Sequence, residues 1–196
     1  IDLKYIHNDE GFLYYLASPD NATQKYLYKT KLNGKGKNEL LSPASLKGSH
    51  DYSFSSNGNY AAHTFSNHFT PYSKEFISIA NHKALTEEES ILKNIKKLEE
   101  KPTTEFFTIT TTDNVEMDGW MVKPTNFDPN KKYPVVFYVY SEPASTTVND
   151  TYYTSKNRLY NGDMAEDGYI YISLDNRGTP SPKGREWRKS IYRKIG

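Results

Sequence analysis

Short runs of alternating hydrophobic and polar residues, separated by turn residues, fill positions 1–83 of the chain. An alternation with a period of two is typical of strands that bury one face. Turn-forming clusters at 18–21 and 56–58, together with the Asn33-Gly34 pair, interrupt the runs where hairpins would reverse the chain. The strands that this pattern predicts are 11–17, 24–32, 51–55, 60–65 and 75–79.

The predicted strands group into two strand-turn-strand units. These units start about forty residues apart, a spacing that fits the blades of a β-propeller. An antiparallel meander of another kind is compatible with the same pattern. Two blades cannot close a propeller, so this region by itself would leave strand edges exposed. The chain also starts inside a strand-like pattern without an initiator Met, and we expect it to be an internal piece of a longer protein.

A change from strand-like to helical spacing marks residues 86–100. Thr86 and Glu89 have the spacing of a capping box, which predicts that a helix begins there. Lys101 and Pro102 end the pattern. We interpret residues 84–102 as a helical connector, whose apolar residues share one face: Ile91, Ile95 and Leu98.

Residues 103–196 carry two long apolar runs. The run 133–140 is rich in β-branched and aromatic residues, which is typical of a strand buried on both faces of a parallel sheet. A second such run, 169–174, follows after a segment long enough for a crossover helix. The remaining predicted elements are strands at 106–110 and 117–122, a loop at 175–179, and a basic helical stretch that runs to Gly196.

This order of elements is that of the opening of an α/β-hydrolase, whose nucleophile lies on a Gly-x-Ser-x-Gly turn after a later strand. No glycine in the chain is followed two positions on by serine. No histidine lies in residues 103–196, so the hydrolase-like part contains no imidazole base. We therefore expect the chain by itself to be inactive.

Composition removes several classes of function. The 25 basic and 24 acidic residues nearly cancel, which argues against a nucleic-acid or anionic membrane partner. No apolar run approaches the roughly 18 residues of a membrane span. The absence of cysteine excludes a disulfide framework, a thiolate zinc site and a cysteine nucleophile. No pattern in the chain implies a cofactor.

The histidines and the candidate aspartates have ordinary interpretations. The histidines lie on predicted turns and strands without the spacing of a zinc site, so we expect neither a metal nor a catalytic role for them. The aspartates are expected to form turns or strand ends rather than a catalytic triad. The residues concerned are His7, His50, His63, His68 and His82, and Asp51, Asp113 and Asp175.

Tyr140 is the principal candidate for chemistry. It closes the first apolar run, and in α/β-hydrolases the loop after this strand supplies a donor to the oxyanion hole. A phenol hydroxyl could serve as that donor without ionising. A packing or surface tyrosine, one of 17 in the chain, is the alternative. In the loop 175–179, after the second apolar run, we expect Arg177 to form a structural ion pair and Gly178 to form a turn.

A family resemblance adds to this reading. Residues 131–143 (Lys-Lys-Tyr-Pro-Val-Val-Phe-Tyr-Val-Tyr-Ser-Glu-Pro), 175–179 (Asp-Asn-Arg-Gly-Thr) and 193–196 (Arg-Lys-Ile-Gly) resemble the dipeptidyl peptidase IV branch of the prolyl oligopeptidase family. Residues 18–24 and 27–29 resemble its last propeller blades. The Asp-Asn-Arg-Gly-Thr-Pro variant is most similar to bacterial members of Bacteroidetes type. Ser141-Glu142-Pro143 departs from the family, in which Ala or Gly commonly precedes the proline.

The resemblance implies a mixed fold. Residues 1–83 would be the closing blades of an all-β β-propeller, 84–102 the connector, and 103–196 the N-terminal part of an α/β-hydrolase domain that lacks the nucleophile. It also implies that Tyr140 completes the oxyanion hole of a serine exopeptidase.

The implied reaction removes N-terminal dipeptides, Xaa-Pro or Xaa-Ala, from peptides with a free N-terminus through an acyl-enzyme. The implied full-length protein is a homodimer that is periplasmic or secreted. Two alternatives stay open: a non-catalytic propeller–hydrolase binding or scaffold protein, and a related prolyl endopeptidase or acylaminoacyl peptidase.

Overall fold

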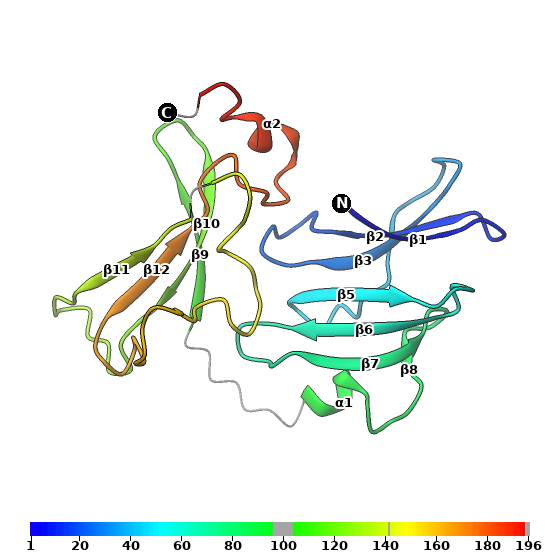
Figure 1. Cartoon of the computed structure of the whole chain (residues 1–196), viewed down its shortest axis with the longest axis horizontal. Helices are drawn as coiled ribbons and strands as arrows, with labels where there is room; N and C mark the ends of the chain where they lie inside the picture. The colour runs from blue at the N-terminus through cyan, green and yellow to red at the C-terminus, as the bar shows by residue number, and fades with distance from the viewer. Residues whose placement is uncertain (96–103, 141, 195–196) are drawn as a thin grey trace. The chain divides into compact units, whose positions relative to one another are not determined.

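The computed structural model describes residues 1–95, 104–140 and 142–194. The chain divides into two compact units, which are considered separately below. The N-terminal unit contains Ile1–Glu100 together with Asp150–Tyr152, and the C-terminal unit contains Lys101–Asn149 and Tyr153–Gly196. The regular secondary structure of the described residues is mostly β-strand, with little helix (Figure 1).

The N-terminal unit consists of two four-stranded antiparallel sheets, each connected strand to neighbouring strand (Figure 1). This is the form of a propeller blade. All the strand runs that the alternation predicted are present, with shifts of a few residues at their ends. The first sheet contains β1 (Asp2–His7), β2 (Phe12–Ala17), β3 (Tyr26–Lys31) and β4 (Glu39–Leu40), and the second contains β5 (Ser49–Phe54), β6 (Tyr60–Ser66), β7 (Ser73–Ser78) and β8 (Lys83–Ala84).

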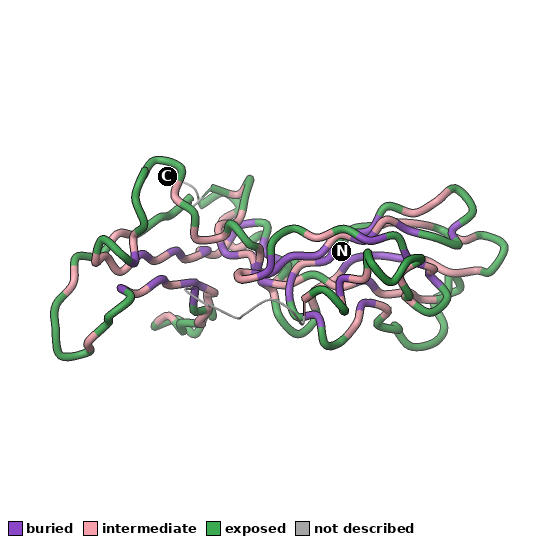
Figure 2. The backbone as a smooth tube through the Cα atoms, turned by 90° about the horizontal axis from the view of Figure 1, so that it is seen from below, coloured by how far each residue is buried: buried purple, intermediate pink, exposed green. Residues whose placement is uncertain are grey.

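One hydrophobic core joins these two sheets. Leu27 of β3 and Ile77 of β7 are fully buried in it, and Tyr14 and Tyr52 lie beside them. Burying a leucine or isoleucine side chain stabilises a fold by about 1.5–3 kcal/mol, so the inward residues of both sheets hold the unit together. Figure 2 shows how short buried stretches alternate with exposed ones along the backbone.

The predicted connector helix begins later than the capping box indicated. Helix α1 spans Ile91–Ile95, and the Thr86 start is therefore wrong. The physical reason is that Ser90 and Glu75 supply the cap: the Ile91 amide donates to Glu75 Oε2 at 2.9 Å, and the Lys93 amide donates to the Ser90 hydroxyl oxygen at 3.4 Å. Ile91 and Ile95 do pack on a common apolar cluster. Leu98, also predicted on this face, lies outside the described residues.

The C-terminal unit contains a mixed four-stranded sheet in the order β11-β12-β10-β9. Strands β11 and β12 are parallel, whereas β12–β10 and β10–β9 are antiparallel pairs. Trp120 and Tyr171 meet edge to face at 4.9 Å in its core. The bounds are β9 (Thr104–Thr110), β10 (Glu116–Val122), β11 (Val135–Tyr138) and β12 (Ile170–Leu174).

Two expectations for this unit are wrong, and the connection between its parallel strands is not helical. Strand β11 is not buried on both faces, since Val135 and Phe137 are 47% and 60% exposed. Within the described residues it is the outer strand of its sheet, bonded only to β12. The connection 142–169 contains turns and no helix. The basic stretch is helical only in α2 (Gly184–Lys189) and continues in turns as far as residue 193.

No helix in the described part of the chain has the length and apolar character to cross a membrane.

Candidate functional site

The carboxyl ends of the parallel strands β11 and β12 form the first candidate site. Ligands bind at this edge in open α/β sheets, because the strand ends and their loops converge there. Tyr140 lies two residues after the end of β11 and is 41% exposed. Asp175 directly follows β12 and is only 4% exposed. Ser141, the next residue of the predicted motif, lies outside the described residues.

Asp175 uses its carboxylate to hold the loop that follows Tyr140. Its Oδ1 accepts the amide of Thr147 at 2.8 Å and lies 3.1 Å from the Thr147 hydroxyl, and its Oδ2 accepts the amide of Val148 at 3.2 Å. Burial raises the pKa of Asp175 above its ordinary value, and the hydrogen bonds from Thr147 and Val148 oppose that shift. Asp175 is thus the strand-end group that the sequence predicted.

Ser173 makes a second connection on the same strand. Its hydroxyl donates to the carbonyl oxygen of Tyr138 at 2.6 Å. The Ser173 oxygen also lies 2.7 Å from the Thr147 hydroxyl, which can donate to it. On the other side, the indole nitrogen of Trp120 donates to the Thr147 carbonyl at 2.8 Å. The backbone on both sides of the Tyr140 loop is therefore fixed to buried side chains.

Arg177 and Gly178 have the structural roles expected of them. Arg177 forms a two-pronged ion pair with Asp113, at 2.5 and 3.1 Å. This guanidinium, helped by the Thr111 hydroxyl, lowers the pKa of Asp113. Gly178 has φ +92°, and a Cβ there would lie 2.5 Å from Ile191. Neither residue is arranged for catalysis.

The second candidate site is a buried polar cluster in the N-terminal unit, which the sequence did not predict. His50 Nδ1 lies 2.9 Å from His63 Nε2, and His63 Nδ1 lies 2.7 Å from Glu75 Oε1. The hydroxyl of Tyr52 lies 2.7 Å from His82 Nε2. Three of the five histidines are therefore brought together. The structure places the other two elsewhere: His68 contacts Asp150, and His7 lies on the β1–β2 hairpin.

Hydrogen-bond geometry fixes the protons of this cluster. His50 Nε2 faces the Leu46 carbonyl, an acceptor, and must carry a hydrogen. Burial, followed by the neighbouring His63, lowers the pKa of His50 to about 3, so its Nδ1 is a bare acceptor for His63 Nε2–H. Burial alone would raise the pKa of Glu75, but bonds from His63 and Ile91 outweigh it and lower that pKa. His63 Nε2 therefore donates to His50, and His63 Nδ1 faces the Glu75 carboxyl group at 2.7 Å.

The same cluster contains three potential metal ligands. His63, Glu75 and His82 offer ligand atoms that lie within 4.8 Å of one another. Two ligands on one tetrahedral zinc ion are about 3.3 Å apart, given bond lengths of about 2.0–2.2 Å. The 2.7 Å contact between His63 and Glu75 is shorter than this and matches a hydrogen bond. We interpret the cluster as a structural proton-sharing network.

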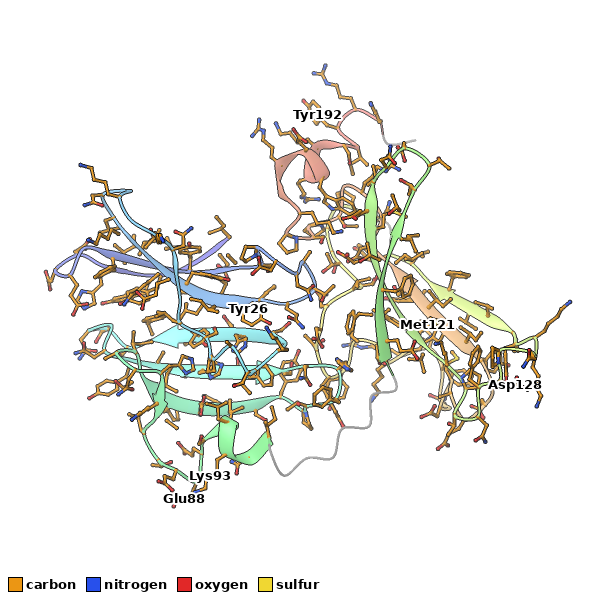
Figure 3. The ribbon with its side chains drawn as sticks, turned by 180° about the vertical axis from the view of Figure 1, so that it is seen from behind. Tyr26, Glu88, Lys93, Met121, Asp128 and Tyr192 are labelled. Carbon is orange, nitrogen blue, oxygen red and sulfur yellow. The ribbon has the colours of Figure 1, made fainter. Side chains whose placement is uncertain are left out.

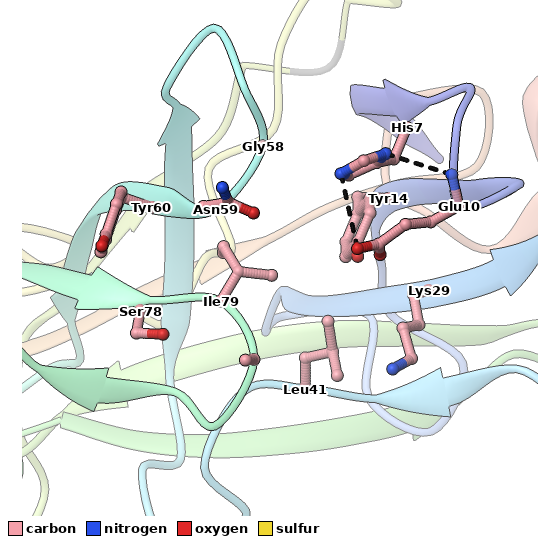
Figure 4. Close-up of a pocket in the computed structure, with 11 residues that line it drawn as sticks. His7, Glu10, Tyr14, Lys29, Leu41, Gly58, Asn59, Tyr60, Ser78 and Ile79 are labelled. Atoms are coloured by element: carbon pink, nitrogen blue, oxygen red, sulfur yellow. Dashed lines mark hydrogen bonds and ion pairs between the residues drawn. The ribbon is translucent and has the colours of Figure 1, made fainter.

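A cavity of about 490 Å³ lies at the hairpin ends of the same two sheets (Figure 4). Its charged residues already have partners: His7 Nε2 lies 3.8 Å from Glu10, and Lys29 lies 3.2 Å from Glu39. Tyr14 and Ile79 supply part of its apolar wall. His7 and Glu10, the bases in the lining, are paired with each other, so the cavity does not suggest catalysis.

Comparisons with known proteins show what the chain is similar to. Residues 2–72 match the family model described as the dipeptidyl peptidase IV N-terminal region. A probable dipeptidyl-aminopeptidase B of Chaetomium globosum is 32% identical over 174 residues, which are 87% of this chain and 18% of that protein. One from Aspergillus oryzae is 31% identical over 95% of this chain and 20% of its own length. The chain thus spans about a fifth of these relatives.

A solved structure extends the likeness to nearly the whole chain. The crystal structure of Porphyromonas gingivalis dipeptidyl peptidase 4 covers 98% of this chain with a TM-score of 0.75 and 29% identity, and the match takes in 26% of that protein. The chain is dipeptidyl peptidase IV-like, as the motifs quoted from its sequence predicted.

Proposed function

We propose that the chain is part of a serine exopeptidase that removes N-terminal dipeptides of the Xaa-Pro or Xaa-Ala type. The observation that supports this most is the likeness to the P. gingivalis dipeptidyl peptidase 4 along 98% of the chain. The curated relatives are also dipeptidyl-aminopeptidases by name. The preference for Pro or Ala rests on the resemblance of the sequence motifs.

In this proposal the two units are parts of two domains. Residues 1–83 are closing blades of a propeller, which the two four-stranded meanders support. Residues 84–102 connect them to 103–196, the first part of an α/β-hydrolase domain. The parallel β11–β12 pair with antiparallel β10 and β9 beside it supports that second assignment.

Tyr140 is the residue of this chain that would touch the reacting atoms. In the full-length enzyme a serine beyond this segment attacks the peptide carbonyl, and the Tyr140 hydroxyl donates a hydrogen bond to the resulting oxyanion. A single donor of this kind is worth roughly 3–4 kcal/mol to the transition state. The serine, its histidine and its aspartate do not come from residues 1–196, so this segment alone is expected to be inactive.

The test uses the full-length protein that contains this segment and a Gly-Pro chromogenic substrate with a free amine. Tyr140→Phe should lower kcat about 10²–10³-fold with little change in KM, because the bond forms only in the transition state. Tyr192→Phe, at a tyrosine 67% exposed in the same unit, is the matched control and should leave kcat unchanged.

Other outcomes separate the alternatives. Hydrolysis of N-blocked peptides in place of the free-amine substrate would identify an endopeptidase or acylaminoacyl peptidase. Tight binding of peptides without turnover would identify a scaffold. We further propose a periplasmic or secreted homodimer, supported by the resemblance alone, and light scattering of the full-length protein tests the dimer.

A further inference from the structure

We propose that Asp175 and Ser173 are positioning residues, which fix the loop of Tyr140 so that its hydroxyl stays at the oxyanion. This inference rests on the proposed function. The two side chains lie two residues apart at the carboxyl end of β12, on the strand that pairs with the one leading to Tyr140. Each is buried, and each bonds to backbone on a different side of Tyr140.

The upstream connection is made by Ser173. Its hydroxyl donates to the Tyr138 carbonyl at 2.6 Å, two residues before Tyr140, and it is 0% exposed. The downstream connection is made by Asp175, whose two oxygens accept the amides of Thr147 and Val148 at 2.8 and 3.2 Å. The hydroxyl of Thr147 lies 2.7 Å from that of Ser173 and so links the two connections.

The hydrogen bonds of Asp175 and Ser173 also restrict the loop that carries Tyr140. A buried carboxylate is costly unless several donors surround it, and here the donors all come from the loop that follows Tyr140. Tyr140 itself is 41% exposed, so its own packing holds it weakly. A catalytic donor that is misplaced by about 1 Å can lose about a hundredfold in rate. The buried pair on β12 supplies the rigidity that the exposed tyrosine lacks.

The experiment is a double-mutant cycle in the full-length enzyme with the Gly-Pro substrate. Asp175→Asn keeps the shape of the side chain but turns an amide donor towards a backbone N–H, which loosens the loop. It should lower kcat about tenfold to a hundredfold in the native background, with KM nearly unchanged. In the Tyr140→Phe background the same substitution should lower kcat less than about twofold, because no hydroxyl is left to position.

The cycle separates this inference from the proposed function. If Asp175→Asn costs the same factor in both backgrounds, the positioning role is wrong while the exopeptidase assignment stands. If Tyr140→Phe has no effect on kcat, the oxyanion role of Tyr140 and the positioning role both fail. Lack of turnover of the Gly-Pro substrate by the native enzyme would instead refute the exopeptidase proposal. Asp113→Asn, a carboxylate exchange in the same unit that leaves the loop bonds intact, is the control and should not change kcat. Should Asp175→Asn fail to fold, Ser173→Ala removes the upstream connection and must show the same dependence on Tyr140.

Discussion

Acid should destabilise the N-terminal unit through two buried histidines. Burial, followed by the charge of His63, lowers the pKa of His50 from 6.5 to about 3 and that of His82 to about 4. In the unfolded chain both imidazoles bind protons near their ordinary pKa of about 6.5. Their neutral, folded forms therefore stabilise the unit fully above pH 6.5, and that stability is lost as the pH falls towards the folded values of about 4 and 3.

The size of the destabilisation follows from the difference between the solution pH and the pKa of histidine in the unfolded chain. A solution at pH 5 lies about 1.5 pH units below the ordinary histidine pKa of the unfolded chain. Each pH unit is worth about 1.36 kcal/mol, so each of the two histidines lowers the unfolding free energy at pH 5 by about 2 kcal/mol. Together His50 and His82 should cost about 4 kcal/mol, which is a large part of the roughly 5–15 kcal/mol that stabilises an average domain.

Urea unfolding at pH 7.5 and pH 5 measures this. Far-UV circular dichroism follows the strands, while tryptophan fluorescence follows the C-terminal unit, because Trp120 and Trp187 are the only two tryptophans and both lie there. Residues 103–196 contain no histidine, so the C-terminal unit serves as an internal reference for acid sensitivity. His50→Gln supplies one donor for Leu46 and one acceptor for His63, and should remove about half of the acid sensitivity.

The control is His7→Gln, on the β1–β2 hairpin outside the buried cluster, which should retain the native acid sensitivity. Equal acid sensitivity in His50→Gln and the native chain would refute the reasoning, because it would show that the unfolded state does not gain its protons at His50.

Two further predictions concern packing and charge. Glu75→Ala leaves buried His63 Nδ1 and the Ile91 amide without their partner, and should lower the unfolding free energy by about 3–5 kcal/mol. Glu75→Gln keeps an acceptor oxygen for the Ile91 amide, and its NH2 can donate to His63 Nδ1 when that nitrogen carries no hydrogen, so it should cost clearly less. Equal losses in urea unfolding would contradict the network. Gly119→Ala puts a Cβ 2.6 Å from the Phe107 ring. It should destabilise the C-terminal unit by about 1–3 kcal/mol, seen as an earlier fluorescence midpoint, and an unchanged midpoint would count against the packing described.

Strands β2, β3, β5, β6 and β7 were predictable because each has a buried face, which produces the period of two. Strand β1 was not among the predicted strands, and none of its residues is buried. Strands β4 and β8 were not predicted from the sequence, because two residues are too few to show a period. Helix α1 was placed too early because its cap is tertiary: Glu75, which bonds the Ile91 amide, comes from β7. Local residue spacing carries no information about a carboxylate supplied by another strand.

The candidate sites divide in the same way. Tyr140 closes one apolar run and Asp175 follows the next, so their places at strand ends could be predicted from the sequence. The histidine cluster could not, since His50, His63 and Glu75 come from three strands. One signal was available: each of them occupies a position on the buried side of its strand, where a hydrophobic residue is expected. Polar residues at such positions need partners, and here they supply one another.

Strand β11 has a practical consequence for work on this segment. Within the described residues one edge of β11 makes no strand pair, and Val135 and Phe137 on it are exposed. An exposed apolar edge is a template to which a strand from another molecule can add. A preparation of residues 1–196 alone therefore presents its own site for aggregation. Dilute samples or the longer protein are the better material for solution measurements.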